Sequence, residues 1–454
     1  MKKSFLLLLI LTLSYSSCRK SDYVLSDQHT LITDKGSGTG TTTWTADKNY
    51  LLNGKVYVND GQTLTIEPGT VIRAKTGQGE KASALIVARG GKIIANGTAQ
   101  KPIIFTVEGD DLQGSVPIES NGLWGGVIIL GNAPVNSDKS ENHIEGINPD
   151  KNERVIYGGS DPNDNSGILR YVSIRHGGTL LSPGNEINGL TLGGVGRGTT
   201  LEYIEVISNR DDGFEFFGGT VNARYLVSAY NGDDAFDFDL GYNGNLQFLV
   251  GIQGPKAEED VNDPALLLEL SDREGSPKTR PLIANGTFIG KGATANKAML
   301  RFDKSASGQI INSIFMDSSY GLQVEYTGKP NDSYQLFTNK HLQFTNNIFH
   351  QVANNSSLQV FSIFTTTNHD ISDEDALLKA HFSEGQNSIL DPGLSTKIPY
   401  QLQPTTSDFG PLAPLPDNPH FQNAPYKGAL PPLPDSPDHN WLQGWTLLST
   451  HLNP

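Results

Sequence analysis

The sequence predicts an all-β solenoid, a parallel β-helix in which short strands stack as coils along one axis. Residues 201–216 and 223–238 repeat one pattern, and Tyr203 recurs as Tyr225, 22 residues later. A fixed period in the twenties is typical of solenoids, whose repeats pack only on their neighbours. The composition agrees, since 49 glycines and 25 prolines in 454 residues indicate many short strands separated by turns.

The first residues have the pattern of an export signal. Lys2 and Lys3 precede an apolar run that is too short for the ~20 residues that span a bilayer. Cys18, the single cysteine, follows two serines, and we expect lipidation there in preference to ordinary signal cleavage. Residues 1–17 are therefore predicted to be a lipoprotein signal peptide, and the polar residues 18–43 a flexible tether.

The charge balance excludes one class of partner. The chain has 34 basic and 49 acidic residues and a formal net charge of −15 at pH 7. Such a charge repels a phosphate backbone, so we expect no nucleic-acid partner. No segment after the export signal is apolar for long enough to cross a bilayer, so we expect a soluble body tethered by its lipid.

The strands of the predicted solenoid begin at Trp44. Apolar and polar residues alternate in them, and turn formers such as Pro68 and Gly69 separate them. We expect strands near residues 55–58, 64–66, 71–72, 85–87, 92–94, 103–105 and 168–174, and weaker coils near 282–289, 309–315, 321–324 and 341–349. The predicted β-helix covers residues 44–370.

Two columns of side chains emerge when the strands around residues 169, 201 and 223 are aligned. The first column contains Arg170, Glu202 and Arg224, and the second contains Tyr171, Tyr203 and Tyr225. Parallel strands lie ~4.8 Å apart, so opposite charges in one column attract, and we interpret the first column as structural. We expect the tyrosines to point into the core, although tyrosines on the outside could stack against sugar rings.

The repeats also predict which residues face the interior. The phenylalanines of two coils alternate with single acids, in the order Phe214, Glu215, Phe216 and Phe236, Asp237, Phe238. We therefore expect the phenylalanines to stack inside and the acids to face outward. Asn209 and Asn231 fall at equivalent turns, where stacked amides can bond to one another.

Residues 371–454 are predicted to form a C-terminal cap. The pattern from Ser372 to Phe382 indicates one short helix with acids in its first turn, and proline-rich loops follow. The last coil of a β-helix leaves an open sheet edge, and we expect the helix and the segment around Trp441 and Trp445 to cover it.

Acidic residues gather at two successive turns and on the strands that follow, at Asp211, Asp212, Glu215, Asp233, Asp234, Asp237 and Asp239. Stacking places like charges about one strand spacing apart, which opposes folding unless something relieves it. Ca²⁺ is the natural candidate, because it binds about six to eight oxygens in flexible geometry. The alternative is that the turn aspartates bond their own backbone N–H groups and the other acids are hydrated.

Catalysis has weaker support in the sequence. A polysaccharide lyase needs a basic residue that removes a proton from the sugar, and the candidates are Arg170, Arg175, His176, Arg210 and Arg224. Glu202 already accounts for two of these arginines as structural partners. The histidines lack the paired spacing of zinc sites, so we expect no zinc.

Five segments, residues 65–72, 124–131, 186–196, 211–221 and 426–446, together resemble a family of right-handed parallel β-helix lipoproteins from Bacteroidota. The family is similar in fold to the pectin-lyase-like superfamily. The resemblance implies an outer-membrane lipoprotein that faces the cell surface or the periplasm, and it implies no known set of catalytic residues. Arg19 and Lys20 stand where exported surface lipoproteins often carry acids, which favours membrane attachment over outside display.

The sequence thus predicts a right-handed parallel β-helix that acts as a binding or structural protein of the envelope. Its expected partners are the membrane, through the lipid, and a polysaccharide or an envelope protein. The alternative is a calcium-assisted polysaccharide lyase or hydrolase that works along the groove of the solenoid.

Overall fold

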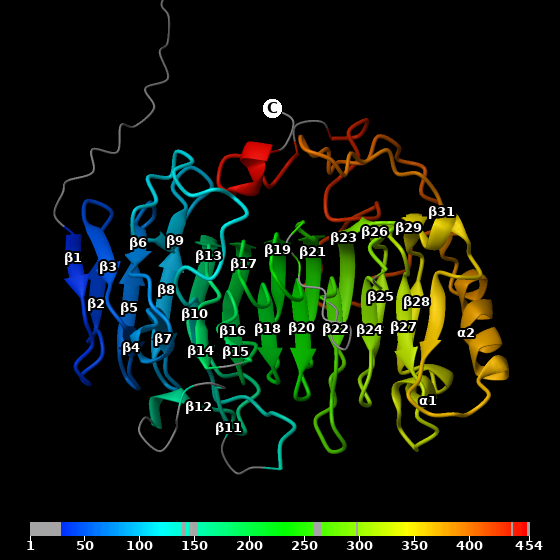
Figure 1. The fold of residues 1–454 in the computed structure, drawn as a ribbon, viewed down its shortest axis with the longest axis horizontal. Helices are drawn as coiled ribbons and strands as arrows, with labels where there is room; N and C mark the ends of the chain where they lie inside the picture. Colours follow the sequence, from blue (N-terminus) through cyan, green and yellow to red (C-terminus); the bar gives the residue numbers. More distant parts are fainter. Residues whose placement is uncertain are drawn as a thin grey trace, which may run out of the picture.

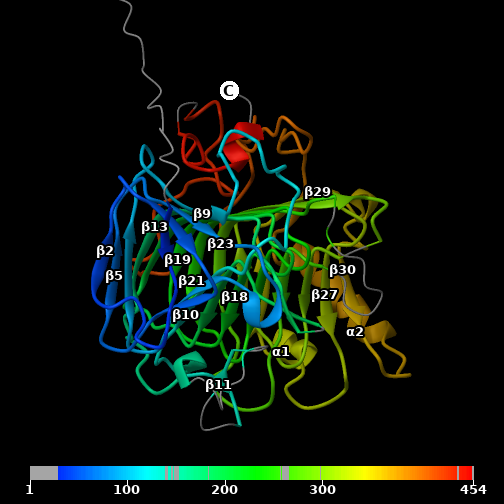
Figure 2. The same ribbon diagram turned by 60° about the vertical axis from the view of Figure 1, so that its left-hand side comes forward.

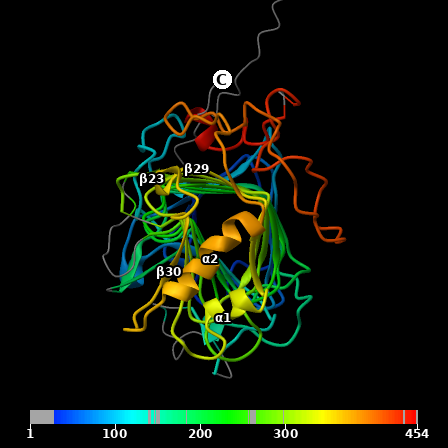
Figure 3. The same ribbon diagram turned by 90° about the vertical axis from the view of Figure 1, so that its right-hand side faces the viewer.

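The structure, a computed structural model, describes residues 29–451 apart from 139–141, 145–146, 148–152, 183, 256, 258–264, 297 and 437–438. Short strands lie side by side along one axis (Figure 1), and viewed along that axis they surround the interior (Figure 3). Pairing within both large sheets is parallel. The predicted right-handed parallel β-helix is therefore confirmed.

One face of the β-helix is a sheet of ten strands, which we call the ten-stranded sheet. In chain order its strands are β4 (Lys55–Val58), β7 (Ala84–Val87), β10 (Val127–Leu130), β16 (Leu190–Gly193), β18 (Phe214–Phe217), β20 (Phe236–Asp239), β22 (Leu268–Leu270), β24 (Leu300–Phe302), β27 (Leu322–Glu325) and β30 (Phe361–Phe364). Each strand between the end strands β4 and β30 pairs with the strand of the coil before and of the coil after it.

The remaining faces belong to a sheet of seventeen strands. They are β1 (His29–Ile32), β2 (Thr42–Trp44), β3 (Asn49–Leu52), β5 (Thr63–Ile66), β6 (Val71–Ala74), β8 (Lys92–Asn96), β9 (Ile103–Val107), β13 (Gly167–Arg175), β17 (Thr200–Ile207), β19 (Ala223–Ala229), β21 (Asn245–Ile252), β23 (Leu282–Gly292), β25 (Gly308–Ile311), β26 (Ile314–Ser318), β28 (Leu342–Thr345), β29 (Ile348–Val352) and β31 (Ser388–Ile389).

Smaller elements lie in the connections. They are the hairpins β11 (Asn142–His143) with β12 (Ile156–Tyr157) and β14 (Leu180–Ser182) with β15 (Asn185–Glu186), the helices α1 (Ser333–Thr338) and α2 (Ser372–Glu384), and the short turns η1 (Gly79–Lys81), η3 (Glu153–Val155), η4 (Ala353–Asn355) and η5 (Leu448–His451).

The larger sheet bends at a column of residues with positive φ. We call this set the corner column, and it contains Tyr171, Tyr203, Tyr225, Phe248, Asn285, Asn312 and Asn346. Strand pairing stops at each of these residues and resumes beyond it. A positive φ turns the strand, so one long strand contributes to two faces.

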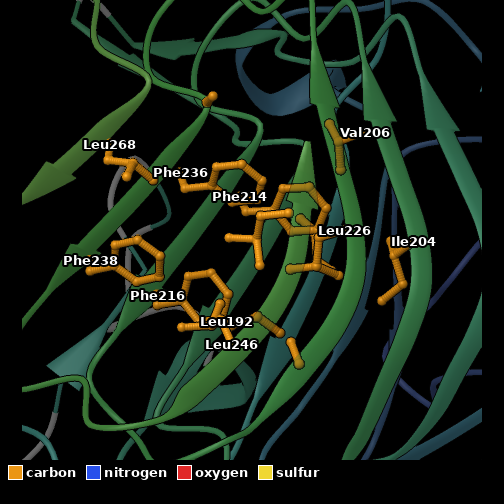
Figure 4. Close-up of a cluster of buried hydrophobic side chains, with 14 of the residues drawn as sticks. Leu192, Ile204, Val206, Phe214, Phe216, Leu226, Phe236, Phe238, Leu246 and Leu268 are labelled. Atoms are coloured by element: carbon orange, nitrogen blue, oxygen red, sulfur yellow. The ribbon is translucent and has the colours of Figure 1, made fainter. Parts of the chain in front are cut away.

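Stacked aromatic rings fill the interior behind the ten-stranded sheet. Phe214 lies over Phe236 with ring centroids 5.2 Å apart, and Phe216 lies over Phe238 at 5.0 Å (Figure 4). Both pairs are in register in the strand ladder, as the repeat predicts. The predicted interior side of the two coils is therefore confirmed.

Helix α2 lies across the C-terminal end of the β-helix (Figure 3). Its buried Phe382 packs on Phe349 and Phe361, with ring centroids 5.9 and 5.7 Å away. The predicted short helix and its role as a cap agree with these contacts.

The rest of the predicted cap lies elsewhere. The chain after β31 runs back along the side of the β-helix, where it follows the tops of β29 to β13 (orange to red in Figures 1 and 2). We call residues 411–451 the C-terminal strap. Trp441 and Trp445 lie over the middle coils and not over the end, so the prediction for this part of the cap was wrong.

The β-helix is also longer than predicted at both ends. β1 pairs with β3, and β2 with β5, so part of the predicted tether belongs to the first coil. The polar Gly-rich turn between them is held by Asp34, whose Oδ1 accepts the backbone N–H groups of Gly36 and Gly38 at 2.7 and 3.0 Å. At the other end β31 still pairs with β29. The signal peptide, Cys18 and residues 19–28 lie outside the described residues.

The tyrosines of the corner column point away from the core, contrary to the prediction. Tyr171 and Tyr203 stack at 4.3 Å, and Tyr203 and Tyr225 at 4.2 Å. Tyr225 also stacks on Phe248 of the same column at 4.8 Å, and each of the three tyrosines contacts Trp445 or Trp441 of the strap. Because a corner residue interrupts the alternation of the strand, its side chain leaves the coil, and the strap covers it.

Candidate functional site

A continuous line of side chains crosses the outer face of the ten-stranded sheet. From β16 onward, one polar residue of each strand faces the outer side of the sheet between apolar or glycine neighbours, and strand register places these residues in one column. We call it the groove column, and it contains Thr191, Glu215, Asp237, Glu269, Arg301, Gln323 and Ser362. After Thr191 the column has three acids, then one cation and then two neutral polar groups.

Acidic side chains from two turns meet the acidic part of the groove column. Carboxylate oxygens of Asp211, Asp212 and Asp233 lie within 4.8 Å of one another, and so do those of Asp212, Glu215 and Asp237. Asp212 belongs to both groups, so the five residues form one contiguous cluster. We call it the acidic cluster.

Two of the seven predicted metal ligands lie outside both groups. Asp234 is a turn residue whose Oδ1 accepts the backbone N–H of Leu266. Asp239 binds the backbone N–H of Leu240 at 2.5 Å. Asp234 therefore bonds the backbone of the next coil and not that of its own turn, which the alternative had predicted. Asp212 does the same, since its Oδ1 accepts the N–H of Asp234 at 2.9 Å, and it also belongs to both oxygen groups.

Burial makes the charges of this cluster costly. Burial, followed by the repulsion of Asp211, raises the pKa of Asp212 well above its usual range. Burial and the nearby Glu269 do the same to the pKa of Asp237. Each shift means that the carboxylates resist losing their protons together. The described residues supply no hydrogen-bond donor to the buried Oδ1 of Asp237.

The donor set fits Ca²⁺. Calcium binds oxygens at about 2.3–2.6 Å, so two ligands of one ion lie at most about 5.2 Å apart, and the oxygens of each group, all within 4.8 Å of one another, meet that limit. A divalent ion would also offset the mutual repulsion and satisfy the unpartnered oxygen of Asp237. Asn188, whose amide donates to Glu215, holds that carboxylate at the cluster.

The basic residues predicted for a lyase are mostly elsewhere. Arg170 and Arg224 pair with Glu202 on the larger sheet, as the column predicts. Arg175 is buried beside Ser173 under the strap, and His176 is buried with its Nδ1 2.6 Å from the carbonyl of Ser120. Only Arg210 lies next to the acidic cluster in the chain, and it pairs with Glu186 at 3.5 Å.

The structure adds residues that the sequence analysis missed. Glu269 and Arg301 continue the groove column, and Asp303 lies two residues after Arg301, directly after the end of β24. Burial, then Glu269, raises the pKa of Asp303 to about 7. The signal was present, because the strands 268–270, 300–302 and 322–324 share the apolar–polar–apolar pattern of 214–216.

Two depressions flank the groove column. One, of about 470 Å³, is lined by Asp239, Asp272, Arg273, Glu274 and Lys304 among others. The other, of about 440 Å³, lies at Gln323 and Ser362, the neutral end of the column. The second depression therefore includes residues of the groove column, whereas the lining of the first contains none of them.

The comparisons agree with this architecture. A family model described as a pectate-lyase-like β-helix domain matches residues 36–387, which include every strand of the ten-stranded sheet. No match was found among curated proteins or among solved structures. Within the described residues, no helix has both the length and the apolar character needed to span a membrane.

Proposed function

Because the chain belongs to the family of pectate-lyase-like β-helix domains, we propose that it binds a glycan along the groove column, with Ca²⁺ held by the acidic cluster. The proposed occupant is an acidic polysaccharide. A calcium ion shared between protein carboxylates and a sugar carboxylate turns a repulsive surface into a binding one. Without the ion, a chain of net charge −15 would repel such a ligand.

The observation that carries this proposal is the acidic cluster itself. Asp212 is 8% exposed and Glu215 is 7% exposed, yet their oxygens stand within 4.8 Å of each other and of Asp237. Buried carboxylates at this spacing are unfavourable without a cation, so their presence on an open face supports a metal-dependent role. Arg301, further along the same column, would pair with a second acidic sugar.

Catalysis is the second candidate function. Asp303, with its pKa raised to about 7, could donate or accept a proton at neutral pH beside the more exposed Glu269. A glycoside hydrolase needs two carboxyl groups beside the bond that it cleaves, and a lyase would act on a uronate held by calcium. Glycan cleavage therefore supplies the alternative to binding alone.

The proposed location is the outer membrane, with Cys18 as the lipidated N-terminus. The support is the sequence pattern around Cys18 and the resemblance to envelope lipoproteins. Replacement of Cys18 by serine would release the protein from the membrane fraction. Membrane association that survives this change would contradict the anchor.

Binding to acidic polysaccharides tests the main proposal. We expect polygalacturonate or alginate to bind in calcium and to be released by a chelator. Asp237→Asn should abolish the calcium-dependent part, whereas Asp239→Asn, from the same strand but outside both oxygen groups, should retain it. Release of reducing ends or of unsaturated sugars would identify an enzyme, and its loss in Asp303→Asn would implicate Asp303.

A further inference from the structure

The depression at the neutral end of the groove column has a chemistry unlike that of the acidic cluster. It has a volume of about 440 Å³ and lies between the turn after β23, the strands β27 and β30, the η4 turn and helix α2. Its polar lining includes Asn296, Gln323, Asn354 and Gln359. The volume falls within the range of about 300–1,000 Å³ that is typical of small-molecule sites.

Four amide side chains contribute to this lining. Each amide offers donors and an acceptor, which is the combination that recognises sugar hydroxyls. Ser319 and Ser362 add hydroxyl groups to the same wall. The depression can therefore bond to several hydroxyls of one ligand at the same time.

An exposed aromatic ring completes the depression. Tyr320 is 43% exposed, although most large apolar residues of the β-helix are buried. Its hydroxyl donates to Oδ1 of Asn296 at 3.1 Å, which fixes the orientation of the ring. An ordered aromatic ring beside amides provides an apolar surface for the C–H face of a sugar ring.

The charge of the lining indicates a neutral ligand. Lys379 is the one charged side chain among the described residues that line the depression, and it pairs with Asp375 on the same helix. No carboxylate from the described lining is available to bind a cation. Binding here should therefore need no calcium.

We propose that this depression is a second carbohydrate site, which binds a neutral saccharide of one or two rings without calcium. The proposal extends the glycan binding proposed above, because Gln323 and Ser362 belong to both the depression and the groove column. A polysaccharide lying along the column would place its acidic units at the acidic cluster and a neutral unit against Tyr320.

Calorimetry with neutral oligosaccharides in the presence of a chelator tests the site. We expect at least one of cellohexaose, xylohexaose and maltohexaose to bind the full chain, and Tyr320→Ala or Gln323→Ala to weaken its affinity about tenfold or more. Tyr320→Phe should retain most of the affinity because the ring remains. Leu358→Ala is the matched control, since Leu358 is 68% exposed in the same region but outside the lining.

The two proposed sites can be tested independently of each other with these variants. Tyr320→Ala should keep the calcium-dependent binding of polygalacturonate or alginate, and Asp237→Asn should keep the chelator-resistant binding of the neutral oligosaccharide. Failure of all three neutral probes, or binding that Tyr320→Ala and Gln323→Ala leave unchanged, would overturn the second site. Loss of acidic binding alone would count only against the calcium site.

Discussion

The side-chain amide of Asn312 bonds to both backbone groups of Ala413. Its Nδ2 donates to the carbonyl of Ala413 at 2.9 Å, and its Oδ1 accepts the N–H of Ala413 at 2.8 Å. Gln247 forms the same reciprocal pair with Gln422, at 2.9 and 2.8 Å. An amide side chain thus takes the place of a neighbouring strand, which allows an irregular segment to dock on a closed β-helix.

The first prediction concerns this docking. Asn312→Ala should lower the free energy of unfolding by about 1–3 kcal/mol, because both backbone groups of Ala413 lose their partner. Limited proteolysis should cut the strap faster in the variant. Gln343→Ala is the control, since Gln343 lies on the adjacent β28 and bonds only locally, to Lys340. Equal cleavage rates in the two variants would contradict the role of Asn312.

Glu205 holds the end of the strap from beneath. Its carboxylate accepts the backbone N–H groups of Leu447 and Leu448, each at 2.8 Å, and it also accepts the hydroxyl of Ser173. Ser173 in turn accepts from the buried Arg175. The carboxylate therefore serves both as the cap of the η5 turn and as the partner of a buried charge network.

The second prediction follows from that network. Glu205→Ala should lower the free energy of unfolding, measured in guanidinium, by about 3–5 kcal/mol, because the buried Arg175 would lose the stronger of its two acidic partners, Glu205 and Asp110. Glu205→Gln should cost less, since it keeps an acceptor for the strap. A cost below about 1 kcal/mol for the alanine variant would mean that Glu205 acts as an ordinary surface charge.

Much of the β-helix could be predicted from its repeats, because stacking converts a sequence period directly into contact. Phe214 over Phe236 follows from the 22-residue interval alone, and so does the position of Glu215 beside Asp237. The strands of later coils have the same apolar–polar–apolar pattern, but loops of different length between them break the 22-residue period. Glu269 and Arg301 were missed for that reason.

The position of the strap could not be predicted. Its docking depends on single amides such as Asn312, and no period connects them to residues about a hundred positions later in the chain. The inward orientation expected for the tyrosines rests on the apolar area that an aromatic ring buries, and the contacts with the strap show that it is wrong. The positive φ of the tyrosines, 55° at Tyr203, reverses that orientation, and it is a tertiary property of the corner.

The third prediction concerns pH. Burial and like charges raise the pKa values of Asp212, Asp234, Asp237 and, to about 7, Asp303. The folded state then binds more protons than the unfolded state, whose aspartates titrate near ~3.9, so stability falls as the pH rises. In a chelator, the melting temperature should therefore decline between about pH 4 and about pH 7.

Calcium should flatten this decline, because it favours the ionised carboxylates that the apo protein resists. The measurement is a series of melting curves across this range with calcium and with a chelator. Magnesium provides a comparison, since it demands a stricter geometry and gives up its water reluctantly. Identical melting curves in calcium and in chelator would show that the acidic cluster binds no calcium.

The fourth prediction isolates one carboxylate. Asp237→Asn removes a buried carboxyl group whose ionisation Glu215 and Glu269 oppose, so it should raise the free energy of unfolding in a chelator at neutral pH by about 1–2 kcal/mol. The same variant should lose the stabilisation by calcium. Asp239→Asn should keep that stabilisation, and a full calcium response in Asp237→Asn would exclude Asp237 as a ligand.

The last prediction concerns the stacked core that carries the groove column. Phe216 is fully buried and contacts Phe238 and Tyr242, with ring centroids 5.0 and 4.6 Å away. Phe216→Ala should cost about 3–5 kcal/mol, because a closed β-helix cannot collapse into the cavity that remains. Phe217→Ala, at the next and partly exposed position, should cost less. Equal losses in the two variants would mean that the interior stack does not set the stability of these coils.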